Sequence, residues 1–118
     1  MPRVLNRLEP YFFVVLRVVA GVLFAFHGMQ KLFGLFGGQR MPLIGQFGLA
    51  GIIEFFGGII IAIGIPTVTP LVALVAALEM IAAYSIAHAP RGLVPIQNSG
   101  ELALLYCAIF LFVAMRSK

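Results

Sequence analysis

The stretch YFFVVLRVVAGVLFAFHGMQKLFG, residues 11–34, decides the fold of this chain. Its first fifteen residues contain one charged side chain, Arg17, and such a run is typical of a transmembrane helix, which needs about 20 mostly apolar residues. The stretch then ends with His27, Gln30 and Lys31, three polar groups that hydrocarbon disfavours. It therefore predicts a membrane helix whose far end carries polar side chains that need partners.

The rest of the chain is similarly apolar. Of its 118 residues 62% are hydrophobic and only 10% are charged, with a mean hydropathy of +1.09, whereas soluble domains average about 25% charged. The composition predicts an integral membrane protein with a single domain, residues 1–118, that contacts the lipid bilayer. The net charge of +4 comes from scattered basic residues at the ends of apolar runs, which indicates headgroup contacts rather than nucleic-acid binding.

Four apolar segments predict an all-α, four-helix membrane bundle with up-down-up-down order. The predicted helices cover residues 11–33, 46–65, 70–89 and 99–115. The link 66–70 is so short that the second and third helices should be antiparallel neighbours. Connection 34–45 is rich in glycine and still apolar, so we expect it to be interfacial or re-entrant. Connection 90–98 holds two prolines and is not expected to form a regular helix.

The basic residues give the predicted orientation. Four of them lie at the two chain ends and three on the opposite side: Arg3, Arg7, Arg116 and Lys118 against Lys31, Arg40 and Arg91. This excess favours both termini in the cytoplasm. The first apolar run is longer than the core of a signal peptide and no A-x-A pattern closes it, so we expect a retained helix. Cys107 is the only cysteine, which excludes an intrachain disulfide.

Ionisable residues inside the spans should face one another, because each costs about 2.5–3.5 kcal/mol near a span's centre. We expect Arg17 to pair with Glu79, with Glu54 close by. One cation against two carboxylates requires that one carboxyl is protonated or is matched by Lys31. Small residues should let the helices approach closely at this level. The glycines expected there are Gly21, Gly28, Gly51, Gly57 and Gly58.

A second polar group is expected on the side opposite the termini, where the antiparallel topology should gather His27, Lys31, His88, Asn98 and Glu101. His88 joins it only if the third helix breaks before Pro90, because His88 is nine residues beyond Glu79 and would otherwise face the opposite way. The whole predicted ligand pocket or polar network consists of Arg17, His27, Lys31, Glu54, Glu79, His88, Asn98 and Glu101.

Other uses of this network stay open. Buried pairs in small bundles can fix helix register without doing chemistry. A haem held by His27 and His88 is disfavoured because the two lack a shared face. A metal site of His27, His88 and Glu101 lacks HxxxH or ExxH spacing, so no metal is predicted. The chain contains no haem, flavin or iron–sulfur motif, and its cofactor is therefore unknown.

The order of these residues resembles the DoxX family of small four-helix bacterial membrane proteins over roughly residues 11–115. The resemblance lies in Arg17, His27-Gly28-x-x-Lys31-Leu32-Phe33-Gly34, Gly51-x-x-Glu54-x-x-Gly57-Gly58, Met80, His88 before Pro90, and Asn98-Ser99-Gly100-Glu101-x-Ala103-x-x-Tyr106. The chain departs from the family at Ser99-Gly100, where members often have paired glycines. Its last helix also ends at residues 115–118 without a glycine-containing turn.

The resemblance implies a protein of the bacterial inner membrane. Because the family's namesakes look like subunits of thiosulfate:quinone oxidoreductases, it also implies a redox subunit, not catalytic alone, that binds a quinone or similar small amphipathic ligand. In this hypothesis His27, Lys31 and Glu101 hold the polar head. Glu54 and Glu79 relay protons and Arg17 sets their charge, while electrons come from the quinone or a protein partner. A structural or assembly protein, and a small homo-oligomeric transporter or proton-coupled carrier, remain the alternatives.

Overall fold

The computed structural model describes residues 2–117, so Met1 and Lys118, the latter counted above among the basic residues, lie outside it. This part of the chain is helical and contains no strand. The elements in chain order are α1 (Arg3–Phe33), α2 (Gln46–Ile63), α3 (Val68–Ala83), the π-helical turn η1 (Tyr84–His88), the 3-10 turn η2 (Ala89–Arg91), α4 (Pro95–Asn98) and α5 (Glu101–Arg116).

Three helical segments are long and apolar enough to cross a bilayer. They are α1, α2 and the continuous helical run Val68–Arg91 that α3 begins. The 16 residues of α5 rise about 24 Å at 1.5 Å per residue, which is shorter than a hydrocarbon layer of about 30 Å. The structure thus confirms an all-helical membrane protein, with three of its helices long enough to span unaided.

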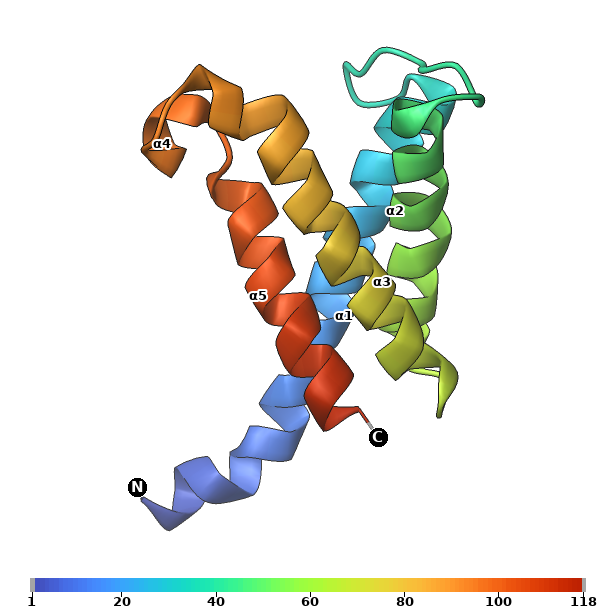
Figure 1. Cartoon of the computed structure of the whole chain (residues 1–118). Coiled ribbons are helices and arrows are strands. Elements are labelled where there is room, and N and C mark those ends of the chain that lie inside the picture. The colour runs from blue at the N-terminus through green and yellow to red at the C-terminus, as the bar shows by residue number, and fades with distance from the viewer. Residues whose placement is uncertain (1, 118) are drawn as a thin grey trace.

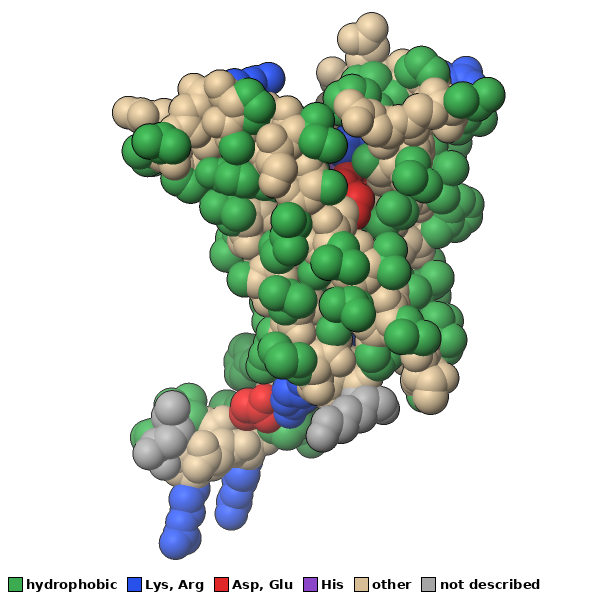
Figure 2. All heavy atoms as spheres, viewed as in Figure 1, with side chains coloured by type: hydrophobic (Ala, Val, Ile, Leu, Met, Phe, Trp, Pro, Cys, Tyr) green, Lys and Arg blue, Asp and Glu red, His purple; other side chains and the backbone are tan. Residues whose placement is uncertain are grey.

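The helices are arranged as two pairs. Helix α1 packs along α2, and α3 packs along α5, while α1 and α5 touch only briefly. The pairs meet near the middle of the molecule and diverge toward the end that carries connection 34–45 (Figure 1). A furrow separates them there, and Figure 2 shows an acidic and a basic side chain lying in it. Aromatic contacts close the bundle below the furrow, where the Phe24 ring of α1 lies 4.7 Å from the Phe110 ring of α5.

Glycines set the distance between α1 and α2. A Cβ atom on Gly21 would lie 2.6 Å from the carbonyl oxygen of Gly58, and one on Gly28 would lie 2.6 Å from the Cα of Phe55. Contacts this short leave no room for a methyl group, so the two backbones touch directly. Gly51 completes this seam beside Lys31 and Leu32. Gly57 lies outside it, since its nearest neighbour is Val72 of α3.

The helix bounds differ from those predicted mainly at the ends. Helix α1 begins at Arg3 rather than near residue 11 and continues through Pro10. Hydropathy marks the part of a helix suited to hydrocarbon, whereas the backbone stays helical beyond that part. Helix α2 ends at Ile63 because Gly64 adopts a left-handed conformation, with φ of 76°, and closes the helix with a bond from its N–H to Ile60.

The connections have different characters. Residues 34–45 form an irregular loop over the shared end of α1 and α2, with Ile44 95% exposed. The segment after η2 holds one helical turn, α4, which the sequence did not predict. Pro95 opens that turn, where its missing N–H has no helical partner to lose.

The adjacent glycines of α2 allow a matched test of the seam. Gly58→Ala should lower the free energy of unfolding by about 1–3 kcal/mol, because the new Cβ would lie 2.5 Å from the backbone nitrogen of Ala25. Gly57→Ala should be neutral or slightly stabilising, since its Cβ would sit 3.4 Å from Val72. Denaturant unfolding in detergent, followed by circular dichroism, measures both. Equal effects would show that the seam tolerates a wider helix separation.

Candidate functional site

One ion pair lies at the centre of the molecule. The Lys31 ammonium nitrogen donates to Glu54 Oε2 at 2.5 Å, linking α1 to α2 beside the glycine seam. Glu54 is 1% exposed and Lys31 is 27% exposed. A charge buried this deeply needs a partner and further hydrogen bonds to offset its lost hydration. Lys31 supplies the partner charge and one hydrogen bond to Glu54, but it leaves the second carboxylate oxygen of Glu54 unbonded.

Two carboxylate oxygens near this pair are left over. Glu79 of α3 is close enough to Glu54 and Lys31 to interact with both electrostatically. Glu54 Oε1 and Glu79 Oε1 are both buried, and neither finds a hydrogen-bond partner among residues 2–117. With every group ionised, two carboxylates face one ammonium and leave an excess negative charge. Such orphaned acceptors are rare in folded proteins and indicate a place for a hydrogen-bond donor.

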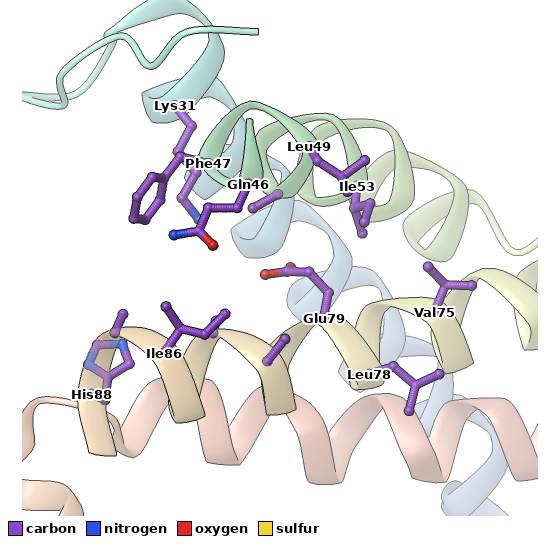
Figure 3. Close-up of a pocket in the computed structure, with 14 residues that line it drawn as sticks. Lys31, Gln46, Phe47, Leu49, Ile53, Val75, Leu78, Glu79, Ile86 and His88 are labelled. Atoms are coloured by element: carbon purple, nitrogen blue, oxygen red, sulfur yellow. The ribbon is translucent and has the colours of Figure 1, made fainter. Parts of the chain in front are cut away.

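The larger of two cavities beside these groups, here called the side pocket, has a volume of about 520 Å³ and lies between α2 and the α3–η1 run. Its walls are mostly apolar, and its four polar lining residues come from α1, α2, α3 and η1. Figure 3 shows Glu79 pointing into the space, with Lys31 and Gln46 on one side and His88 on the other. Leu49, Leu78 and Ile86 form its rim and are half exposed, so the pocket opens sideways toward lipid.

The smaller cavity, here called the inner hollow, has a volume of about 260 Å³ and lies between α1 and the α3–α5 pair. Six polar residues line it: His27, Lys31, Glu54, His88, Ser99 and Tyr106. The His27 ring meets the Tyr106 ring edge to face at 5.8 Å. Lys31 and His88 line both cavities, so the two meet at these side chains.

His88 reaches the site because the helix changes geometry before Pro90. Residues Tyr84–His88 form a π-helical turn, which takes more residues per turn than an α-helix and so rotates the following side chains. On a continuous α-helix His88 would oppose Glu79, yet both line the side pocket. The condition predicted from the sequence, a break before Pro90, is therefore met by a π turn followed by the 3-10 turn η2.

Asn98 holds this broken segment in place. Its side-chain amide donates to the Tyr84 hydroxyl at 3.0 Å and to the Gly92 carbonyl at 2.9 Å, and its Oδ1 accepts from the Gly100 N–H at 2.8 Å. The Asn98 carbonyl also lies 3.1 Å from His88 Nδ1. Because a carbonyl only accepts, Nδ1 carries the hydrogen in this bond. Asn98 therefore orients His88 from behind and is fully buried, away from both cavities.

Arg17 differs most from its predicted role. Its guanidinium Nη1 donates to the backbone carbonyls of Ile61 and Ala62, at 2.7 and 3.0 Å. These are unpaired acceptors at the C-terminus of α2, where a cation also complements the helix dipole. Within residues 2–117 Arg17 joins no ion pair, so the expected Arg17–Glu79 pair is not formed. Arg17 lies fourteen residues, about 21 Å, along α1 from Lys31 and is too far away to act there.

Glu101 is likewise outside the site. It is exposed at the start of α5 and lines a separate shallow depression with Ser99 and Leu102. Its helix begins at Glu101 rather than near residue 99. Of the eight predicted residues, five line the two cavities: His27, Lys31, Glu54, Glu79 and His88. In the described part of the chain no three His, Cys, Asp or Glu side chains are placed to hold a metal ion.

Three polar lining residues were not predicted as part of the site: Gln46, Ser99 and Tyr106. Gln46 is the first residue of α2 and shares a helix face with Ala50 and Ile53, which also line the side pocket. This spacing, with a polar residue opening an apolar face, was a signal that the sequence offered. Tyr106 occurs in the family motif but has no polar neighbour in sequence. Only its packing against His27 places it at the inner hollow.

Comparisons with known proteins bear on the same region. A sequence model described as DoxX matches residues 12–89, a span that includes Lys31, Glu54, Glu79 and His88. An uncharacterized protein of Haemophilus influenzae is 36% identical over 115 residues, which covers 92% of this chain and 84% of that protein. No solved structure matches the chain.

Breaking the central ion pair should be strongly destabilising. Lys31→Met leaves the Glu54 charge unpaired in a site that is 1% exposed, so the free energy of unfolding should fall by about 3–5 kcal/mol. Adding Glu54→Leu should restore most of this loss, because the unpaired Glu54 charge is then removed as well. Glu9→Gln is the control, since it breaks the exposed pair with Arg116 and should cost at most about 1 kcal/mol. Equal losses from Lys31→Met and Glu9→Gln would contradict this account.

Proposed function

The chain belongs to the DoxX family, and we propose that it is a membrane subunit of a redox system that binds a quinone, or a similar small amphipathic molecule, in the side pocket. The observation that carries this proposal is a lipid-facing apolar pocket with an unpartnered buried carboxylate oxygen at its inner wall. The apolar part of an amphipathic molecule fits the apolar walls, and its polar head fits the carboxylate at the inner wall.

The size and the lining of the side pocket fit a quinone head. Its volume of about 520 Å³ lies within the range of small-molecule sites, about 300–1,000 Å³. Lys31 and Gln46 are hydrogen-bond donors suited to quinone oxygens, and Glu79 is placed to accept from or donate to the same head. An isoprenoid tail would leave between Leu49, Leu78 and Ile86 toward lipid. Such a head supplies two-electron chemistry coupled to two protons.

The chain's own residues would handle the protons. Glu79 faces the side pocket and interacts with Glu54, which lines the inner hollow. Lys31 is paired with Glu54 and lies beside both cavities, so it takes the charge-setting role that the sequence assigned to Arg17. Protons would pass between the two carboxyl groups. Electrons would come from a protein partner, so the subunit would not catalyse a reaction alone.

We further propose that α5 is the fourth span of an up-down-up-down bundle in the bacterial inner membrane, with both termini in the cytoplasm. Arg3, Arg7 and Arg116 gather at one end, where the Arg116–Glu9 pair at 2.7 Å holds the first and last helices together. A helix of 16 residues spans if the bilayer thins locally. Loop 34–45 would then lie at the opposite interface, where its exposed Ile44 enters the headgroup region.

A structural or assembly role is the competing proposal, and Arg17 and Asn98 favour it because their polar groups are satisfied internally. Glu54 and Glu79 favour a ligand instead, because each keeps a buried oxygen that has no hydrogen-bond partner among residues 2–117.

Glu79→Leu separates the two roles by the sign of its effect. If Glu79 serves a ligand, Glu79→Leu removes an orphaned acceptor and a like charge beside Glu54, and it should stabilise the protein by about 1–3 kcal/mol. The same variant should retain less quinone when it is purified from native membrane and extracted. A register-fixing Glu79 predicts the opposite change in stability, and that result would favour the assembly role.

Filling the side pocket tests the binding site directly. Ala82 lines the pocket, so Ala82→Phe should weaken binding of decylubiquinone or a menaquinone analogue at least tenfold, about 1.4 kcal/mol. Ala108→Phe is the matched control, because Ala108 is an exposed helical alanine of α5 outside the cavities described. Thermal shift in lipid nanodiscs reports binding by both proteins. Wild-type protein that purifies without quinone and melts unchanged with either analogue would refute the proposal.

A further inference from the structure

The first ten residues of α1 extend beyond the bundle. Helix α1 has 31 residues and is therefore about 46 Å long, whereas hydrocarbon needs only about 30 Å of it. Pro10 lies inside the helix and cannot donate a backbone hydrogen bond to Asn6. Figure 1 shows α1 bending below α5, so that its N-terminal part runs sideways rather than along the bundle.

This extension, residues 3–12, is amphipathic. Arg3 and Arg7 are one helical turn apart and share a face, while Val4, Leu8 and Phe12 form a second face. Both faces are exposed, with Val4 at 64% and Phe12 at 63%. A helix with separate basic and apolar faces is the kind that lies in a membrane surface.

Contacts with α5 fix how the extension is rotated. Glu9 Oε2 accepts from Arg116 Nη2 at 2.7 Å, and the Arg116 guanidinium lies 4.3 Å from the centre of the Phe13 ring. The Phe13 ring in turn packs edge to face on Phe112 at 5.6 Å. With the rotation set this way, the two basic side chains of the extension point away from the bundle (Figure 2). They therefore lie beyond the apolar part of the protein.

We propose that residues 3–12 form a surface helix that binds the headgroups of anionic lipids through Arg3 and Arg7. An Arg guanidinium presents donors in a fork that matches phosphate oxygens, and the two lie one turn apart. The apolar face, with Val4, Leu8 and Phe12, rests at the boundary between headgroups and acyl chains. The site is independent of the side pocket and of any redox role.

The test places a reporter beside the basic face. The intact protein, with Cys107→Ser and Asn6→Cys, carries a nitroxide at position 6 and is reconstituted in nanodiscs of phosphatidylcholine containing increasing phosphatidylglycerol. The label should lose mobility as phosphatidylglycerol increases. In Arg3→Gln/Arg7→Gln the apparent affinity for phosphatidylglycerol should fall about 30-fold, which corresponds to about 2 kcal/mol at about 1 kcal/mol per basic residue.

Two variants control for charge and fold. Arg40→Gln/Arg91→Gln removes the same charge from exposed positions at the opposite end of the molecule and should titrate like wild type. Arg3→Lys/Arg7→Lys keeps the charge and should retain most of the response. The proposal is overturned if the label behaves identically with and without phosphatidylglycerol, or if the Arg40/Arg91 variant loses the response equally. Immobilisation that requires a soluble acidic protein would also overturn it, and would identify a protein as the occupant.

Discussion

The direct contact between the backbones of α1 and α2 is the constraint on which the rest of the structure depends. Gly21 meets Gly58, and Gly28 meets Phe55, with no side chain between the helices. At this separation Lys31 reaches Glu54 in a place from which water is largely excluded. A wider spacing would hydrate the pair and remove the reason for a lysine at that depth. The glycine contacts between α1 and α2 thus determine how closely Lys31 and Glu54 approach and how little water reaches them.

Satisfied and unsatisfied polar groups occupy different parts of this molecule. Away from the two cavities, Arg17 closes the end of α2 and Asn98 holds the turn before α5, and both bond to backbone groups within the chain. Beside the two cavities, Glu54 and Glu79 each keep one oxygen without a hydrogen-bond partner among residues 2–117. The polar groups away from the cavities therefore hold the backbone in place, and the carboxylates beside the cavities keep oxygens that can accept a hydrogen bond. This division follows from where the two helix pairs diverge.

Several features could be predicted from the sequence because they depend on local properties. Apolar runs located the helices, and antiparallel connectivity placed Lys31 and His88 toward the same end of the bundle. The partner of Arg17 could not be predicted, because charge counting considers side chains and ignores the carbonyl groups at a helix end. The exposure of Glu101 depends on how α5 is rotated against its neighbours, which the sequence motif does not specify. The rotation of His88 depends on a π turn, which periodicity alone does not specify.

The rim of the side pocket has a consequence for how any occupant arrives. Leu49, Leu78 and Ile86 face the acyl chains, so a molecule entering between them comes from the membrane and not from water. Its concentration at the entrance is then set by its partition coefficient and by two-dimensional diffusion. A modest intrinsic affinity suffices for high occupancy under those conditions. Partitioning into the bilayer favours every lipophilic molecule alike, so it does not select among them. Selectivity would therefore be decided at the inner wall, where Glu79 and Lys31 line the pocket.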